Sequence, residues 1–250
     1  QGLARVAKMQ HRDGGWGWWT DDESSVYMTA YVVAALQDAQ AADLAFDTSM
    51  LARGQQALAG MVQQDLVEYR RAHAEWVSDS DAYFAWVMAR GGQKNDEINK
   101  YLWERRIHLS SYGKLLASMA FHQLGDKDKA ALLLKNAEQN LKSDDENETS
   151  WLETRTEGWW YWWNDDIETN AMYLRALDQQ RPKDERSGRV VKWLLNHRQH
   201  GWYWDSTRDT AQVIAAFANH MQVSGERRPN YDLEVLWDGK LKKSVHIDDK

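Results

Sequence analysis

The sequence of 250 residues contains no cysteine and only two prolines. Without cysteine the chain has no disulfide, no thiol nucleophile and no thiolate metal site. This absence does not decide the compartment, because a periplasmic domain can simply lack cysteine. Sandwiches and barrels use proline and glycine at their turns. With two prolines and 15 glycines in 250 residues, the composition favours long helices instead.

Long apolar runs and a basic surface are also missing. No stretch approaches the ~20 apolar residues that a membrane span needs, and Gln1–Arg5 is interpreted as the interior of a domain rather than a signal peptide. The formal net charge is −7, with acidic and basic residues mixed along the chain. A nucleic-acid-binding protein would show a basic face, so no nucleic-acid partner is expected. The longest charged run, Lys142–Glu148, is interpreted as a solvated loop.

Tryptophan is unusually abundant, with 15 residues. Many of them fall into three clusters, each just before a segment with a helical pattern. The clusters are Trp16, Trp18 and Trp19; Trp159, Trp160, Trp162 and Trp163; and Trp202 and Trp204. A feature that recurs before similar segments indicates an internal repeat.

Three segments that follow these clusters can be superposed. They are Tyr27–Leu36, Glu168–Leu177 and Arg208–Phe217. Their shared pattern is a small polar residue, an alanine, four mostly apolar positions, another alanine and a large apolar residue. Because the segments are apolar nearly all round, we predict helices that are buried on more than one side. Ala30, Ala171 and Ala211 should then occupy equivalent positions that are nearly inaccessible to solvent.

Weaker copies of the same pattern lie at Ser80–Ala89 and Ser110–Phe121. An amphipathic segment precedes each buried one. These segments are Gly2–Met9, Ser49–Gln64, Asp96–Glu104, Lys127–Leu141 and Glu185–His197. A linear stack of such helix pairs leaves the inner helices only moderately buried, whereas a closed ring buries them on all sides. The pattern therefore predicts an all-α fold, an α/α toroid of about five helix pairs, over residues 1–222.

The last stretch has a different period. Gly225–Pro229 breaks the helical pattern, and Tyr231–Trp237 and Lys243–Ile247 alternate like strands around the turn sequence Asp238-Gly239. A lone hairpin is marginally stable in water. Residues 225–250 are therefore predicted to be the β-strands that begin a further β-domain.

Two motifs resemble bacterial α2-macroglobulins: the Asp-Gly-Gly-Trp stretch with the helix after it, and the Ser-Thr-x-x-Thr-Ala stretch near residue 210. The residues that carry the resemblance are Asp13, Gly14, Gly15, Trp16, Trp18, Trp19, Thr29, Ala30, Tyr31, Ser206, Thr207, Asp209, Thr210 and Ala211. The Thr-Ala-Tyr core is also similar to complement components. The resemblance covers residues 1 to about 222, although residues 40–150 match only by pattern.

The resemblance implies a fold and a role. In that family the thioester domain is an α/α toroid of six helix pairs, inserted into the CUB domain. A Cys-x-Glu-Gln motif on the first inner helix forms a thioester that traps proteases covalently, although some bacterial members lack it. Because this chain has no cysteine, the implied role is that of a scaffold without catalysis or cofactor. Its partners would be the other domains of a periplasmic or cell-surface protein and, through that protein, proteases.

A six-pair ring with about five pairs present should have a gap. Val6, Val33, Ile214 and Phe217 are expected to form an apolar patch beside it, and such patches rarely stay bare in a monomer. The ring could tighten, the segment after Gly225 could fold across the gap, or two copies could pair through it. We expect the second or third outcome, because wedge-packed helices do not easily re-space.

Other proteins with toroids offer enzymatic alternatives. Gln10–Trp16 also resembles a repeat of triterpene cyclases, but the acidic Asp-x-Asp-Asp motif of those enzymes is not supplied by Asp79–Ala82. Protein prenyltransferases need a zinc-binding cysteine. Toroid glycosidases use paired carboxylates, and several acids lie near the tryptophan clusters. These are Asp21, Asp22, Asp165, Asp166, Asp205 and Asp209, which are interpreted as helix caps and first-turn acids.

The eight histidines show no metal-ligand spacing. His197 and His200 are close in sequence but are expected at a helix end and in a loop. His73 lies roughly where complement proteins place an activating histidine, but its surroundings do not match, so that role is not assigned. The tryptophans are predicted to cap one end of the ring and pack on a neighbouring domain, and an interaction scaffold remains the second alternative.

Overall fold

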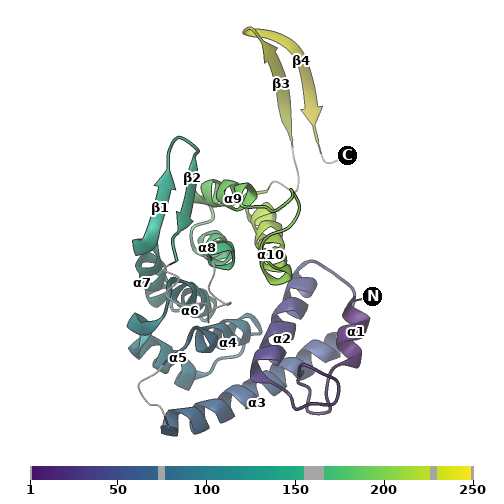
Figure 1. Cartoon of the computed structure of the whole chain (residues 1–250), viewed down its shortest axis with the longest axis vertical. Coiled ribbons are helices and arrows are strands. Elements are labelled where there is room, and N and C mark those ends of the chain that lie inside the picture. The colour runs from purple at the N-terminus through teal and green to yellow at the C-terminus, as the bar shows by residue number, and fades with distance from the viewer. Residues whose placement is uncertain (1, 73–76, 155–165, 226–229, 249–250) are drawn as a thin grey trace.

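A computed structural model describes residues 2–72, 77–154, 166–225 and 230–248. The chain is mostly α-helical and ends in a two-stranded antiparallel hairpin (Figure 1), which confirms the predicted fold class. Helices of two kinds alternate along it, as the repeat predicts.

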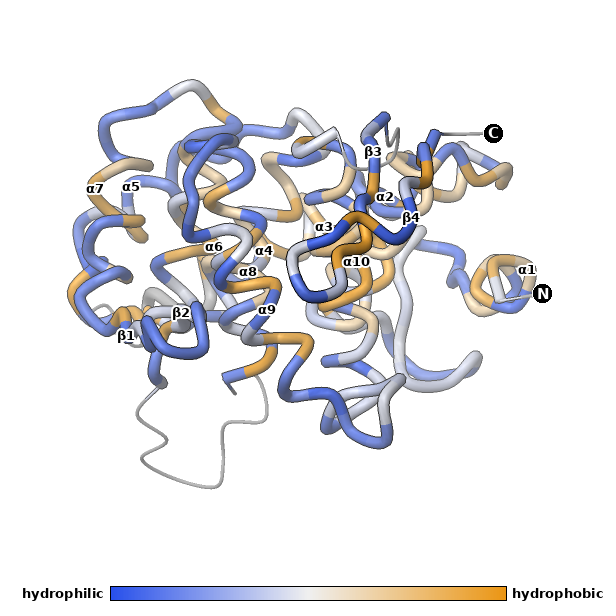
Figure 2. Tube along the Cα trace, turned by 90° about the horizontal axis from the view of Figure 1, so that it is seen from above, coloured by the Kyte–Doolittle hydropathy of each residue, from blue (hydrophilic) through white to orange (hydrophobic). Residues whose placement is uncertain are grey.

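The buried kind forms the centre of the molecule. These inner helices are α2 (Val26–Ala41), α4 (Asp79–Arg90), α6 (Ser111–Gln123), α8 (Asp166–Gln180) and α10 (Thr207–Ser224). Every residue of α4 from Ala82 to Ala89 is buried, because the helix carries apolar side chains on all sides. In Figure 2 the hydrophobic stretches gather around α4, α6, α8 and α10, and hydrophilic ones lie mainly at the periphery.

The amphipathic kind lies outside. These outer helices are α1 (Gly2–Lys8), α3 (Thr48–Ala72), α5 (Asp96–Glu104), α7 (Lys127–Ala137) and α9 (Arg186–Asn196), with short 3₁₀ turns η1 (Arg106–His108) and η2 (Glu138–Asn140). On α9, for example, Val190, Trp193 and Leu194 are buried, whereas the opposite face is exposed. The largest difference from the predicted bounds is α3, which continues beyond Gln64.

The inner helices run parallel and pack in chain order. At their first turns, the rings of Tyr27 and Tyr83 stack with centroids 6.3 Å apart. At their last turns, Arg90 donates to Asp38 over 2.6 Å. Each of α4, α6 and α8 packs between two inner helices, whereas α2 and α10 each pack extensively on one. The five helices therefore form an arc in which the two end members have an open side.

A buried tryptophan locks the first turn of an inner helix at both ends of the arc. The backbone N–H of Trp16 donates to Thr29 Oγ1 over 2.9 Å, and its indole N–H donates to a carbonyl of α1. The backbone N–H of Trp204 donates to Thr210 Oγ1 over 3.0 Å, and its indole N–H donates to a carbonyl of α9. The same contacts at both ends support the superposition of these segments.

Asn170 takes the place of the threonine in the third copy. Its Oδ1 accepts from the N–H of Leu152 over 2.7 Å, and its Nδ2 donates back to the carbonyl of Leu152. Ala30 and Ala171 are fully buried, as predicted. Ala211 is exposed, so that prediction was wrong. The physical reason is that, in the part of the chain that the structure describes, no inner helix packs on this face of α10.

A second hairpin was missed. Where a solvated loop was expected, β1 (Leu141–Asp144) pairs with β2 (Thr149–Leu152), and α7 ends before Leu141, at Ala137. Ser143 and Ser150 join across the strands through a 2.9 Å hydrogen bond between their hydroxyls. The charged side chains of this run lie at the hairpin tip, where Asp145 and Glu148 contact α9.

The C-terminal hairpin was predicted well. β3 (Tyr231–Trp237) has the predicted bounds, and β4 (Lys240–Ile247) begins slightly earlier than expected. Asp238 and Gly239 both have positive φ, 48° and 70°, as a two-residue hairpin turn requires. The hairpin stands apart from the helices in Figure 1, and its apolar side chains are largely exposed.

The patch expected beside the gap is only partly present. Val33 is fully buried, so its predicted exposure was wrong, because it faces the core beneath Trp16 and α3. Val6 and Phe217 are half-buried. Ile214 is 57% exposed, as predicted. The described part of the trailing segment does not cover this face (Figure 1), so folding of the segment across the gap is not observed.

Candidate functional site

The first turns of the five inner helices meet in one group of polar and aromatic side chains. We call this group the mouth cluster; its members are Tyr27, Tyr31, Tyr83, Tyr112, Glu168 and Arg208. Because the helices are parallel, the positive ends of their dipoles face the same region. Negative charge is therefore favoured at this end of the arc.

A buried ion pair lies at the middle of the mouth cluster. Glu168 is 1% exposed and accepts hydrogen bonds from the Tyr112 hydroxyl, over 2.8 Å, and from the Arg208 guanidinium. Burial alone would lower the pKa of Arg208, but the Glu168 carboxylate and the surrounding tyrosines together outweigh it and raise that pKa above its usual value. A buried carboxylate is tolerated only when it is paired in this way.

Tyrosines surround the ion pair. The ring of Tyr27 stacks on Tyr31 and on Tyr83, both with centroids 6.3 Å apart. Burial raises the pKa of Tyr27, Tyr31, Tyr83 and Tyr112, so all four phenols remain protonated at neutral pH. The Tyr83 hydroxyl is buried and has no hydrogen-bond partner among the described residues. Among the described residues, the cluster thus consists of four protonated phenols and one buried ion pair.

The open side of the arc continues from the mouth cluster along α10. Ala211, Ile214, Ala218 and Met221 are exposed on successive turns of one face. Small and large apolar side chains in alternation are typical of a helix–helix contact. The geometry therefore offers a seat for one more helix beside the ion pair.

A second ionic group joins the C-terminal halves of three inner helices. Asp38 on α2 accepts from Arg90 on α4, over 2.6 Å, and from Arg175 on α8, over 3.0 Å. Both guanidiniums lie over the Trp86 ring, 4.8 and 5.1 Å from its centroid. Burial raises the pKa of Asp38, but Arg175 and Arg90 outweigh it, so the pKa lies below its usual value. These contacts hold the arc together.

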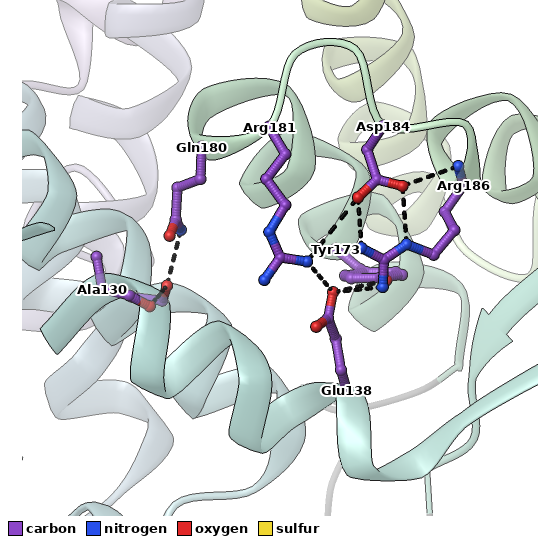
Figure 3. A network of polar contacts seen from close by, with 8 residues as sticks. Ala130, Glu138, Tyr173, Gln180, Arg181, Asp184 and Arg186 are labelled. Atoms are coloured by element: carbon purple, nitrogen blue, oxygen red, sulfur yellow. Dashed lines mark hydrogen bonds and ion pairs between the residues drawn. The ribbon is translucent and has the colours of Figure 1, made fainter. Parts of the chain in front are cut away.

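Figure 3 shows a third ionic group, where α7, α8 and α9 meet. Glu138 accepts from Arg181, over 2.8 Å, from Arg186, over 2.9 Å, and from the Tyr173 hydroxyl, over 3.1 Å. Arg186 also pairs with Asp184. Each of the two carboxylates accepts from at least one guanidinium, which indicates a structural role.

The residues of the family motifs lie around the inner-helix starts. Asp13 accepts from the N–H of Gly15, over 2.9 Å, and Gly14 has a positive φ of 89° with the Arg53 backbone against it. Ser206 caps α10 by accepting from the N–H of Asp209, over 3.0 Å. These residues shape loops and helix ends, and Thr207 begins α10.

The carboxylates near the tryptophans have different roles. Asp166 and Asp209 lie in first turns. Asp22 and Asp205 instead hold loops, by accepting from Trp18 and Trp19 in one case and from Gln199 in the other. Asp21 is exposed. Asp165, like the cluster Trp159–Trp163, lies outside the described residues.

The histidines singled out in the sequence also have separate surroundings. His197 stacks on Trp193 with ring centroids 3.9 Å apart, and His200 lies in a tight turn with a positive φ of 47°. His73 lies outside the described residues. Within the described ranges, no group of three His, Asp or Glu side chains is arranged to hold a metal ion.

Sequence reasoning missed the mouth cluster, although a signal for it was available. Tyr27, Glu168 and Arg208 are the first residues of the three superposed segments. Equivalent positions of parallel helices meet at one level, so the alignment placed an acid, a base and a tyrosine together. The shared pattern of the repeat lies in its apolar positions, whereas these polar positions differ from copy to copy.

The chain is similar to proteins of one class. It is 25% identical over 221 residues, 88% of its length, to an α2-macroglobulin of Thermotoga maritima. Solved structures of native Escherichia coli α2-macroglobulin and of the Salmonella protein reacted with methylamine each match 99% of the chain, at 17% identity, with TM-scores of 0.65 and 0.64. No protein-family model matches.

These matches support the bacterial α2-macroglobulin family, which the sequence motifs predicted. The chain spans 12% of the Thermotoga protein and 15% of each of these solved chains. The structural likeness at this identity establishes the fold. Among the described helices, none has the length and apolar character needed to cross a membrane.

Proposed function

We propose that residues 1–222 are the helical scaffold of the thioester domain of an α2-macroglobulin-like protease inhibitor. The observation that carries this proposal is the match to the Thermotoga α2-macroglobulin over 88% of the chain. The open face of α10 supports it, because a six-pair toroid needs one more inner helix between α10 and α2. Residues 225–250 would begin the CUB-like domain, and the exposed apolar face of the hairpin agrees with that assignment.

The chain itself would supply no covalent chemistry. It has no cysteine, so a reactive thioester would come from another part of a longer protein. In this proposal the sixth inner helix packs on the exposed apolar face of α10, with its first turn beside Arg208, Tyr27 and Tyr31. The buried ion pair and the protonated phenols would hold that turn in a water-poor environment. The longer protein would act in the periplasm or at the cell surface, with proteases as its targets.

The test uses the longer protein that contains this chain. After incubation with elastase or trypsin, the protease should remain bound on a sizing column, cleave small peptides and fail to cleave a large protein substrate. A trapped protease gives this combination of results, because small peptides still reach its active site and a large protein does not. Free protease that retains activity on the large substrate would overturn the proposal.

A variant addresses the scaffold role directly. Ile214→Lys should leave the stability of the isolated chain unchanged, because the side chain is exposed. In the longer protein the same change should impair protease retention, since a charge would face the seated helix. Ile107→Lys is the matched control, because Ile107 is 74% exposed and lies away from this face, on η1. Equal retention by both variants would contradict the proposed seat.

A further inference from the structure

Two loops at the mouth end of the arc present aromatic side chains to solvent. The first precedes α2 and exposes Trp18 and Trp19, at 61% and 75%. The second precedes α10 and exposes Trp202 and Tyr203, at 77% and 42%. The helices that follow these loops meet in the mouth cluster, so both loops lie at the same end. Large aromatic side chains with this exposure mark interaction sites.

The first loop is built to hold its two tryptophans in place. The Asp22 carboxylate accepts from the N–H of Trp18, over 2.7 Å, and from that of Trp19, over 3.1 Å. His11 closes the loop with contacts to the carbonyl of Trp19 and to the Ser24 hydroxyl, over 3.0 and 2.9 Å. A rigid aromatic side chain loses little conformational entropy when a ligand binds. The loop is therefore a preformed platform.

A glycine is part of this construction. A Cβ at Gly17 would lie 1.9 Å from Asp22 Oδ1, so only glycine lets the carboxylate reach the two N–H groups. The second loop is also tightly turned. It has positive φ at His200 and Gly201, and the carbonyl of Tyr203 accepts from the N–H of Gln199 over 2.6 Å.

The composition of the loops indicates the chemistry of the ligand. Residues 17–25 and 197–206 contain no Leu, Ile, Val or Met. The cores of protein–protein interfaces combine aromatic side chains with methionine and are depleted in aspartate, glutamate and serine, all three of which occur in residues 17–25. Aromatic rings flanked by carboxylates, amides and hydroxyls are instead suited to stack on a flat ligand face and to accept or donate hydrogen bonds at its rim.

The charge of the two loops distinguishes between two kinds of flat ligand, nucleic-acid bases and sugar rings. Residues 17–25 contain Asp21, Asp22 and Glu23 and no lysine or arginine. Residues 197–206 contain one arginine and one aspartate. Nucleic acids need several cations to neutralise their phosphates, and this surface does not provide them. A pyranose ring has a flat C–H face for stacking and uncharged hydroxyls at its rim.

We propose that the tips of these two loops form a binding surface for a neutral oligosaccharide, with Trp18, Trp19 and Trp202 as stacking platforms. Asp21 and Asp205 accept hydrogen bonds from sugar hydroxyls at the edges of the platforms. The site binds a glycan and does not cleave it. This inference rests on the loops alone and does not depend on the proposed inhibitor function.

The test is a titration of the full chain with chitohexaose and, separately, with cellohexaose. Binding is measured by calorimetry and by tryptophan fluorescence. Saturable binding to at least one of the two is expected. Trp19→Ala and Trp202→Ala should each weaken it by about tenfold or more, on the scale of a lost stacking contact. Trp19→Phe keeps an aromatic face and should retain most of the binding. Trp237→Ala, at an exposed position on β3, is the matched control and should bind as the unaltered chain does.

Thermal unfolding of each variant checks that the fold is intact; the substituted side chains are exposed, so the midpoints should not change. Polyuridylate serves as a polyanionic aromatic ligand and should not bind. The proposal is overturned if neither oligosaccharide binds saturably, if both loop variants bind like the unaltered chain, or if polyuridylate binds more tightly than the sugars.

Discussion

Thr29 and Thr210 accept the same hydrogen bond at the two ends of the arc, in different surroundings. Thr29 is fully buried, whereas Thr210 is half-buried. Thr29→Val keeps the shape but leaves the N–H of Trp16 without an acceptor, and we expect a loss of about 1–3 kcal/mol in the free energy of unfolding. Urea unfolding of the variant and of the unaltered chain measures this loss.

Thr210→Val is the control for Thr29→Val, because water can replace the lost acceptor at this half-buried position. The loss in the free energy of unfolding should be clearly smaller for Thr210→Val. If the two variants lose equal stability, burial does not set the cost of this contact.

Asp38 makes stability depend on pH. Its pKa in the folded chain lies below the usual value, because Arg175 and Arg90 outweigh the effect of burial. A carboxylate with a lowered pKa contributes stability that is present above its unfolded pKa, about 3.9, and is lost as pH falls through the folded value. Asp38→Asn should therefore destabilise the chain at neutral pH, and the difference should shrink below about pH 4.

Urea midpoints measured between neutral and acidic pH test this expectation. Asp128→Asn, on the exposed side of α7, is a matched control that should follow the unaltered chain throughout. A stability difference for Asp38→Asn that stays constant down to acidic pH would show that the carboxylate charge is not responsible.

At the scale of elements, one buried amide connects the β1–β2 hairpin to the core. Asn170 exchanges two hydrogen bonds with the backbone of Leu152, whereas the hairpin tip is joined to α9 by exposed ion pairs. Asn170→Ala should cost about 1–3 kcal/mol for each backbone group left buried without a partner. Asp145→Asn should change stability by less than about 1 kcal/mol. Chemical denaturation distinguishes the two, and the reverse order would mean that the tip anchors the hairpin.

The same elements show how far the sequence predicts the fold. The inner and outer helices follow from their periodicity, and the C-terminal hairpin follows from Asp238-Gly239 between alternating strands. The β1–β2 hairpin could not be predicted, because Lys142–Glu148 has the composition of a solvated run and its strands are short. The contact between Glu168 and Arg208 joins residues 40 positions apart, so no local pattern indicates it, and only the alignment of the repeats brings the two positions together.

At the scale of the whole molecule, the arc should not be uniformly stable. The helices α4, α6 and α8 have an inner neighbour on both sides, whereas α2 and α10 have one. Local opening is easiest where fewest apolar contacts must be broken. Amide hydrogen exchange should therefore be slowest in α4, α6 and α8 and faster in α10. Protection of α10 equal to that of α6 would contradict this gradient.

The packing of inner helices in chain order has a consequence for biosynthesis. Each helix finds its main partners among segments that have already left the ribosome, so most native contacts close short loops and little chain entropy is spent at any step. The chain can grow pair by pair during translation, with each new pair adding to a surface that is already folded. The last of the described inner helices to emerge, α10, completes the arc while one of its faces stays exposed.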